Sequence, residues 1–227
     1  MNLERPVTRA FLIAIALSIV LPYLPIVRLL LLPFDYLNTH LHEMFHALTA
    51  ILTGGQVSHI QVFTDGSGVT FTRGGLTPAI QMAGYLGSSL FGAAMIQSAT
   101  NEKAARIWLQ VLGGMVLVSN VIWVRGDLVG WTIGLAWPVV ILVLASRLKG
   151  DSLVFAAQFF AVQQCLNALK SVRDLVLLAR TDVPTDAQLM AQSTHIPAIV
   201  WALLWAGVSL FGIGLAVVKM NSSVKRS

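Results

Sequence analysis

Residues 29–52 read LLLLPFDYLNTHLHEMFHALTAIL, and this apolar stretch contains the run His42-Glu43-Met44-Phe45-His46. Two histidines four residues apart lie on one face of an α-helix, where their imidazoles can bind one zinc ion. The glutamate beside the first histidine can take a proton from a water bound to that metal. Ionisable side chains are costly inside a membrane and usually have a function there. The stretch therefore predicts a membrane helix that carries a catalytic metal site, rather than a chance match.

The composition indicates an integral membrane protein. Of the 227 residues, 56% are hydrophobic and 11% are charged, whereas soluble domains carry about 25% charged residues. The mean hydropathy is +0.76. The formal charge of +5 comes from basic residues scattered at the ends of apolar stretches. This pattern is typical of membrane anchoring, so we expect the lipid bilayer as a partner and no nucleic acid.

Apolar stretches of spanning length recur along the chain. They predict an all-α polytopic membrane protein with six or seven transmembrane helices, in a single domain over residues 1–227. Basic residues near both ends of the sequence favour an even number of spans, whereas the hydropathy pattern favours seven, and both numbers stay open. The predicted spans cover residues 10–26, 29–52, 78–99, 107–124, 128–145, 153–178 and 196–218.

The interval between residues 54 and 75 is polar and rich in glycine, and it does not have the pattern of a helix. Residues 57–63 and 69–72 are rich in β-formers, and Asp65-Gly66-Ser67-Gly68 between them is typical of a turn. These features predict a β-hairpin insert over about residues 54–75, directly after the metal-binding helix. Such a hairpin could bind an extended substrate segment along its exposed edge, or it could be a plain interfacial connector, and the sequence favours neither.

A catalytic zinc usually has three protein ligands and one open position, so the histidine pair needs a third ligand. Asp174 is the first candidate, because it lies in the second half of an apolar stretch where an unpaired carboxylate would be costly. Its alternative role is an ion pair with Arg173 or Arg180 near the membrane surface. Asp186 is the second candidate, and its alternative role is to cap a short helix that starts after Pro184.

Other polar and small residues have simpler roles. His40 is offset from the histidine pair around the helix, so we expect it to line the site or lie at the interface. His195 precedes the last span, where an interfacial role is expected. The run Gly84-Tyr85-Leu86-Gly87 gives the third span a small-residue face, which we expect to pack closely against the metal-binding helix. The sequence assigns no residue to substrate binding.

Taken in order, these motifs resemble the M50B-like membrane metallopeptidases, within the wider site-2-protease group. The resemblance extends from about Leu41 to Leu210, without the PDZ-like domain that many site-2 proteases possess. In the wider group the third ligand is an aspartate from a later span, usually followed by glycine, whereas Asp174 is followed by Leu175. The matching motifs are HEMFHAL at 42–48, LTGG at 52–55, DGSG at 65–68, TRGG at 72–75, AGYLG at 83–87, SVRD at 171–174 and DA at 186–187, with Pro197 and the tryptophans at 201 and 205 in the last span.

The resemblance implies a zinc-dependent intramembrane endopeptidase that hydrolyses peptide bonds in membrane protein segments. His42 and His46 would be zinc ligands, and Glu43 would be the catalytic acid and base. It implies membrane protein substrates and an integral location in a membrane, which we take to be a bacterial plasma membrane. The alternative is a non-catalytic membrane scaffold on the same fold, against which Glu43 argues, because a scaffold has no need for a glutamate between two histidines.

Overall fold

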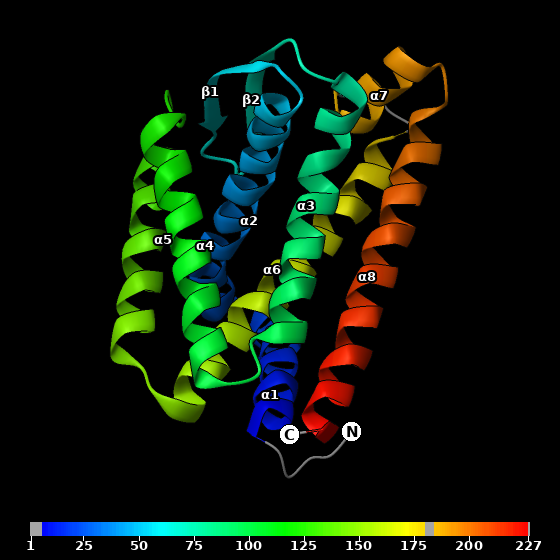
Figure 1. Cartoon of the computed structure of the whole chain (residues 1–227). Coiled ribbons are helices and arrows are strands. Elements are labelled where there is room, and N and C mark those ends of the chain that lie inside the picture. The colour runs from blue at the N-terminus through cyan, green and yellow to red at the C-terminus, as the bar shows by residue number, and fades with distance from the viewer. Residues whose placement is uncertain (1–5, 180–183, 227) are drawn as a thin grey trace.

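The computed structural model describes residues 6–179 and 184–226, with the backbone alone described at residues 22, 25–31 and 222–226. It is about 80% helical and has eight helices and a two-stranded hairpin in its described part, in agreement with the predicted fold class. The helices (Figure 1) are α1 (Pro6–Val20), α2 (Pro25–Leu52), α3 (Thr77–Ser98), α4 (Glu102–Ile122), α5 (Leu128–Arg147), α6 (Gly150–Leu178), α7 (Asp186–Thr194) and α8 (Ala198–Arg226).

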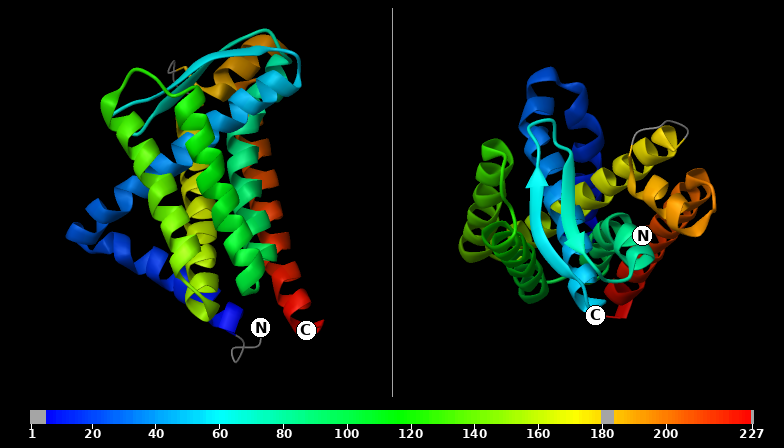
Figure 2. Two further views of the ribbon diagram at one scale, coloured as in Figure 1. Left: turned by 60° about the vertical axis from the view of Figure 1, so that its left-hand side comes forward. Right: turned by 90° about the horizontal axis from the view of Figure 1, so that it is seen from above.

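Helices α1 and α2 meet at a break formed by the 3-10 turn η1 (Leu21–Tyr23), with Pro22 inside it and Pro25 at the start of α2. Proline lacks a backbone N–H and its ring interrupts a continuing helix, so the two helices form separately. Figure 2 shows this break at the side of the bundle, at a level between its two ends. Helix α1 and helix α2 together therefore connect the end of the molecule where α1 starts to the hairpin.

The predicted hairpin is present between α2 and α3, and it lies over the end of α2 (Figure 1). Strands β1 (Gln56–Val62) and β2 (Gly68–Arg73) pair antiparallel from Gln56↔Arg73 to Val62↔Gly68, with a bulge between Val57 and His59. The turn is closed by the Asp65 carboxylate, which accepts from the Ser67 backbone N at 2.9 Å. The other edge of β1 forms a bridge with the α4–α5 connection, where Ile60 pairs with Val124.

The bundle is built around α3 and α6, which contact each other and most other helices. Gly92 of α3 permits this approach, because a Cβ there would lie 2.8 Å from Cys165 Sγ and 3.2 Å from the Ala161 carbonyl. Fully buried aliphatic side chains fill the space between α2, α4, α5 and α6, and they include Leu41, Leu109, Ile141 and Leu153. In this arrangement the second half of α2, which carries the histidines, lies between the hairpin and α3.

Five of the described helices are long and apolar enough to cross a membrane: α3, α4, α5, α6 and residues Ala198–Asn221 of α8. This agrees with a polytopic membrane protein, but the predicted count of six or seven spans is not reproduced. Helix α1 has 15 residues, which gives a length of about 22 Å, whereas the hydrocarbon core of a bilayer is roughly 30 Å thick. Helix α1 is therefore too short to cross by itself, and the predicted first span, residues 10–26, is not confirmed.

Candidate metal centre

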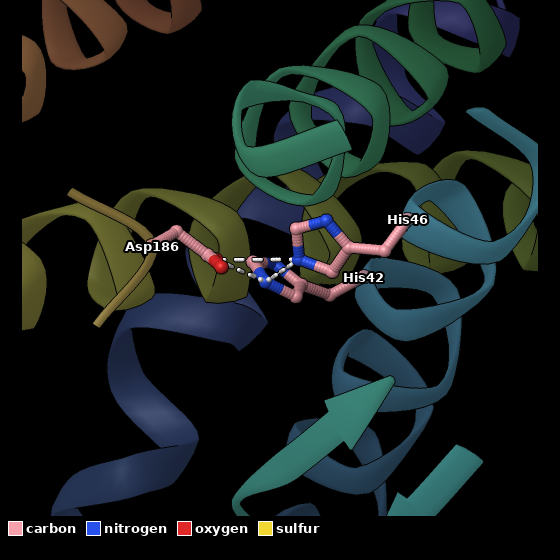
Figure 3. A group of neighbouring side chains, drawn as sticks. All are labelled: His42, His46 and Asp186. Atoms are coloured by element: carbon pink, nitrogen blue, oxygen red, sulfur yellow. Dashed lines mark hydrogen bonds and ion pairs between the residues drawn. The ribbon is translucent and has the colours of Figure 1, made fainter. Parts of the chain in front are cut away.

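The structure brings three ligand groups together: His42 and His46 from α2 and Asp186 from the first residue of α7. Their ligand atoms all lie within 4.8 Å of one another. The two Nε2 atoms are 2.9 Å apart, and Asp186 Oδ2 is 3.2 Å from each of them. Figure 3 shows the three side chains converging on one point, with the aspartate opposite the pair of rings.

The donor set fits a divalent metal such as zinc. Two imidazole nitrogens and one carboxylate oxygen are a ligand combination found in catalytic zinc sites. Ligands about 2.0–2.1 Å from a tetrahedral ion lie roughly 3.3 Å from one another, close to the 2.9 and 3.2 Å separations of these three atoms. Small movements of the side chains would therefore be enough to admit an ion among them.

The ring of His46 is held in the tautomer that a metal ligand needs. Its Nδ1 lies 2.6 Å from the carbonyl oxygen of Ile80 in α3. Because a carbonyl only accepts, Nδ1 must carry the proton, and a neutral ring then presents the Nε2 lone pair to the cluster. Such a hydrogen bond to the far ring nitrogen also fixes the orientation of a ligating histidine.

Close packing of α3 places both histidine rings. A Cβ at Gly84 would overlap His42 and His46 Nε2, and one at Gly87 would overlap the ring of Phe45. The predicted packing of this small-residue face against the metal-binding helix is confirmed. Tyr85, the next residue, packs edge to face on His42 with ring centroids 4.5 Å apart, and it stacks on Trp205 of α8 at 5.6 Å.

Asp186 is positioned by the start of α7 and is ionised by its surroundings. Thr185 is the N-cap residue, and its side chain accepts from the backbone N of Gln188, so the capping role considered for Asp186 belongs to Thr185. Burial raises the pKa of the Asp186 carboxyl, but without a bound metal the positive charge of a protonated His46 and hydrogen bonds from both histidines lower it more, so the pKa lies well below its ordinary value. A bound metal ion would replace that positive charge, with His46 neutral, and would likewise favour the ionised carboxylate.

Glu43 is buried beside the histidines and is held by β2. The Thr70 hydroxyl is 2.6 Å from Glu43 Oε2 and 3.0 Å from the Glu43 carbonyl oxygen, so it can donate to either. A Cβ at Gly68 would lie 2.7 Å from both Glu43 Oε1 and Thr39 Cγ2, which shows how closely the strand approaches α2. The Thr39 hydroxyl donates to the Gly66 carbonyl at 2.7 Å and ties the turn to the same helix.

A pocket of about 470 Å³ extends from the ligand cluster. Its walls come from five elements that are distant in sequence: α2, β2, α3, α6 and α7. Both histidines, Glu43 and Asp186 line it, together with the segment 66–70 of the hairpin. The pocket thus joins a candidate metal site, a carboxylate and part of strand β2.

In a comparison with known protein families, residues 10–216 match the model of the family described as Peptidase M50B-like. The chain belongs to the Peptidase M50B-like family. Peptidases of the M50 group are metallopeptidases. This member of the family has a His-His-Asp group that could hold a metal. No curated protein and no solved structure matches the chain.

In this M50B-like chain the second candidate aspartate, Asp186, lies beside the histidines, whereas the first candidate, Asp174, does not. Asp174 lines the pocket, but its carboxylate accepts from the Arg173 side chain at 2.8 and 3.1 Å and is not in the ligand cluster. Its environment is thus the ion pair that was its alternative role. Arg180, the other partner considered for it, lies outside the described residues.

Two of the other histidines, His40 and His195, lie outside the ligand cluster. His40 is buried, and its Nε2 is 3.1 Å from the Gly130 carbonyl oxygen in α5. His195 caps the end of α7 with a φ of 61°. Both side chains therefore have structural roles. His40 is buried between α2 and α5 and does not lie at the membrane interface, which was one of its two expected positions.

Sequence reasoning missed three contributors to the site: the Ile80 carbonyl, Thr70 and the packing surface of Tyr85. A backbone carbonyl leaves no signal in a sequence, because every residue has one. Thr70 could have been suspected, since it lies in the second β-rich run of a hairpin that follows the metal helix directly. The glycines on either side of Tyr85 indicate a close helix contact, but they do not show which rings Tyr85 touches.

Proposed function

We propose that the chain is a zinc-dependent intramembrane endopeptidase that cleaves membrane protein segments. The observation that carries the proposal is the convergence of His42, His46 and Asp186 in one pocket with Glu43. A bound zinc ion would supply an acidified water and would polarise the scissile carbonyl. In a scaffold protein, neither the open pocket beside the ligands nor the adjacent glutamate would be needed.

Glu43 is the proton carrier of this proposal. Its Oε2 is oriented by the Thr70 hydroxyl at 2.6 Å, and its side chain is 5% exposed and faces the pocket. In this position the carboxylate can take the proton of the attacking water and pass it to the leaving amine. Thr70 keeps the carboxylate in place between these two steps, so it is a positioning residue.

Strand β2 is suited to hold the substrate backbone. It pairs with β1 along one edge, and its residues Gly68, Val69, Thr70 and Thr72 line the pocket. An extended segment can add to such an edge through backbone hydrogen bonds. A transmembrane helix shields its carbonyls in its own hydrogen bonds, so the substrate must unwind locally before cleavage. The hairpin would stabilise that unwound segment, which favours the substrate-binding role over a plain connector.

The test is the variant Glu43→Gln, with cleavage measured on single-span membrane peptides that carry a fluorophore and a quencher on either side of the span. We expect cleavage to fall by about 10²- to 10⁴-fold, the usual contribution of a general acid or base, while zinc content stays at the wild-type level. Glu102→Gln is the matched control, because it makes the same change at the opposite end of the molecule. Full cleavage by Glu43→Gln would remove this residue from the mechanism. Absence of zinc from freshly purified wild-type protein would instead favour the scaffold.

A further inference from the structure

A buried series of hydrogen-bonded side chains joins α2 to α6 beside the pocket. Gln164 Nε2 donates to Asn38 Oδ1 at 2.6 Å, and Asn38 Nδ2 donates to Ser171 Oγ at 3.1 Å. The Ser171 hydroxyl in turn donates to the Asn167 carbonyl at 3.0 Å. Asn38 and Gln164 are 4% and 3% exposed, so the protein holds these two amides in fixed orientations with little competition from water.

One proton of the Asn38 amide group remains unused. A carboxamide has one oxygen that accepts hydrogen bonds and an NH₂ group with two protons to donate. The Asn38 oxygen accepts from Gln164, and one Nδ2 proton is donated to Ser171. The second Nδ2 proton has no acceptor among the described residues. A buried donor without an acceptor is costly, and Asn38 lines the pocket, so this proton is available to a bound molecule.

Asn38 lies beside the part of the pocket where β2 begins. Its neighbour Thr39 donates to the Gly66 carbonyl at 2.7 Å, whereas Thr70, further along the hairpin, contacts Glu43. Strand β2 therefore runs beside α2 in the same direction, with Asn38 near its start. Asn38 precedes the first metal ligand by four residues, which is a rise of about 6 Å along the helix. The same length corresponds to about two residues of an extended strand.

A segment that pairs with β2 would have an outer edge of its own. Strand β1 covers the other edge of β2, and the view from above (Figure 2) shows that the free edge faces α6 and α7. Backbone groups on the outer edge would point that way, and unpaired ones are costly away from water. On the α2–α6 side of the pocket, Thr39 and Ser171 already donate their hydroxyl protons and the Asp174 carboxylate only accepts. The Asn38 amide is therefore the donor that this side offers to a carbonyl.

We propose that Asn38 is a substrate-binding residue that donates its free Nδ2 proton to a backbone carbonyl of the bound segment, about two residues from the scissile bond. Gln164 is the positioning residue that orients the amide. The identity of the bound segment as a substrate rests on the proposed function. Because the contact is made to backbone, it adds affinity without a preference for a particular side chain. Strand β2 and Asn38 would together hold the two edges of the unwound segment.

Binding can be separated from cleavage in the Glu43→Gln background. The probe is the single-span peptide of the cleavage assay with the fluorophore alone, and fluorescence anisotropy in detergent gives its Kd. Asn38→Leu keeps the approximate size of the side chain and removes its protons, so we expect Kd to rise about tenfold, a usual effect of leaving a buried acceptor unpaired. Asn120→Leu is the matched control, because Asn120 is a buried asparagine of α4 that donates to the Trp131 carbonyl outside the pocket. Equal Kd values for the two variants would overturn the proposal.

A series of modified peptides identifies the carbonyl that Asn38 contacts. In each peptide one backbone amide is replaced by an ester, whose carbonyl is a weaker acceptor. One ester should weaken binding several-fold in the Glu43→Gln protein and should add no further loss in Asn38→Leu, because its partner is already absent. Losses that add in full would show that the two groups do not interact. If Asn38→Leu does not fold, Asn38→Asp serves the same test, since an ionised aspartate has a similar shape and no proton to donate.

Gln164→Leu tests the positioning role. Without its donor the Asn38 amide can turn, so binding should weaken less than in Asn38→Leu and the effect of the ester should become smaller. An ester effect of full size would show that Gln164 does not orient the amide. Metal content should stay at the wild-type level in these variants, and its loss would assign the hydrogen-bonded series to the integrity of the metal site instead. If the wild type cleaves no peptide but Asn38→Leu binds more weakly than the control, the peptidase proposal fails and the binding contact stands.

Discussion

The end of α6 and the start of α7 each bring an aspartate to the same pocket, yet the two carboxylates have different partners. Asp186 lies 3.2 Å from Nε2 of both histidines and its side chain is 18% exposed. Asp174 is 2.8 Å from an exposed arginine, and its side chain is 44% exposed. An apolar stretch of sequence is therefore a poor guide to which carboxylate can reach a metal. The partner that each carboxylate meets in the fold is the better guide.

The largest expected effect comes from removing each aspartate in turn. Asp186→Ala takes away a direct ligand. Loss of a residue that only supports a ligand lowers metal affinity by up to about 100-fold, so we expect a larger fall here, and cleavage at background. Asp174→Ala removes only a partner of Arg173 and should keep about one metal per chain. Metal content by mass spectrometry of the purified proteins, together with the cleavage assay, distinguishes the two.

The opposite result for these two variants would assign the third ligand differently. If Asp174→Ala lost the metal and Asp186→Ala kept it, the ligand set would include the end of α6. The close approach of Asp186 to the histidines would then be an ion pair of the metal-free protein. Loss of metal in His46→Ala is the positive control for both variants.

Much of the fold can be predicted from residue spacing, turn residues and the length of apolar runs. The spacing of His42 and His46 fixes one face of a helix, and the turn residues between two β-rich runs fix a hairpin next to it. Apolar runs of sufficient length identify α3 to α6 and α8, because no other structure can cross lipid there. The glycines around Tyr85 indicate a close helix contact, which they make.

Expectation and structure differ where a residue's role depends on contacts distant in sequence. Asp186 follows a polar, proline-containing connection, and nothing near it in the sequence shows that α7 folds back over α3 to reach the histidines. The first apolar stretch, residues 10–26, is interrupted by Pro22 and Pro25, and the sequence alone does not show whether it still crosses the membrane. Tertiary packing decides both points, and a single sequence does not encode it locally.

Close packing by α3 is expected to place the two histidine rings where they reach Asp186 of α7. In Gly84→Ala the new methyl group overlaps both imidazoles, and relief of such overpacking costs about 1–3 kcal/mol. Because each 1.4 kcal/mol corresponds to a factor of ten, we expect metal to bind about ten times more weakly. Gly114→Ala in α4 is the matched control, since a Cβ there meets nothing within 4 Å. Equal metal affinity in the two variants would contradict a positioning role for Gly84.

Tyr85 gives a smaller effect that depends on the ring and not on the hydroxyl group. The Tyr85 ring lies between His42 and Trp205, so Tyr85→Ala leaves a gap on one side of a ligand and should weaken metal binding several-fold. Tyr85→Phe keeps both ring contacts and should bind metal as the wild type does. A loss of cleavage in Tyr85→Phe at normal metal content would instead assign the hydroxyl a direct part in the reaction.

The smallest effect is expected for Arg173→Ala, which removes the partner of Asp174 and leaves Asp186 untouched. The two side chains of this ion pair are 70% and 44% exposed, and pairs of this kind contribute at most about 1 kcal/mol to stability. We expect little change in thermal stability, and metal content and cleavage at the wild-type level, because Asp174 would remain a solvated carboxylate at the edge of the pocket. A gain of a second metal would show that Arg173 keeps Asp174 from binding one. In that case the contrast between the two aspartates would come from a single arginine and not from their positions in the fold.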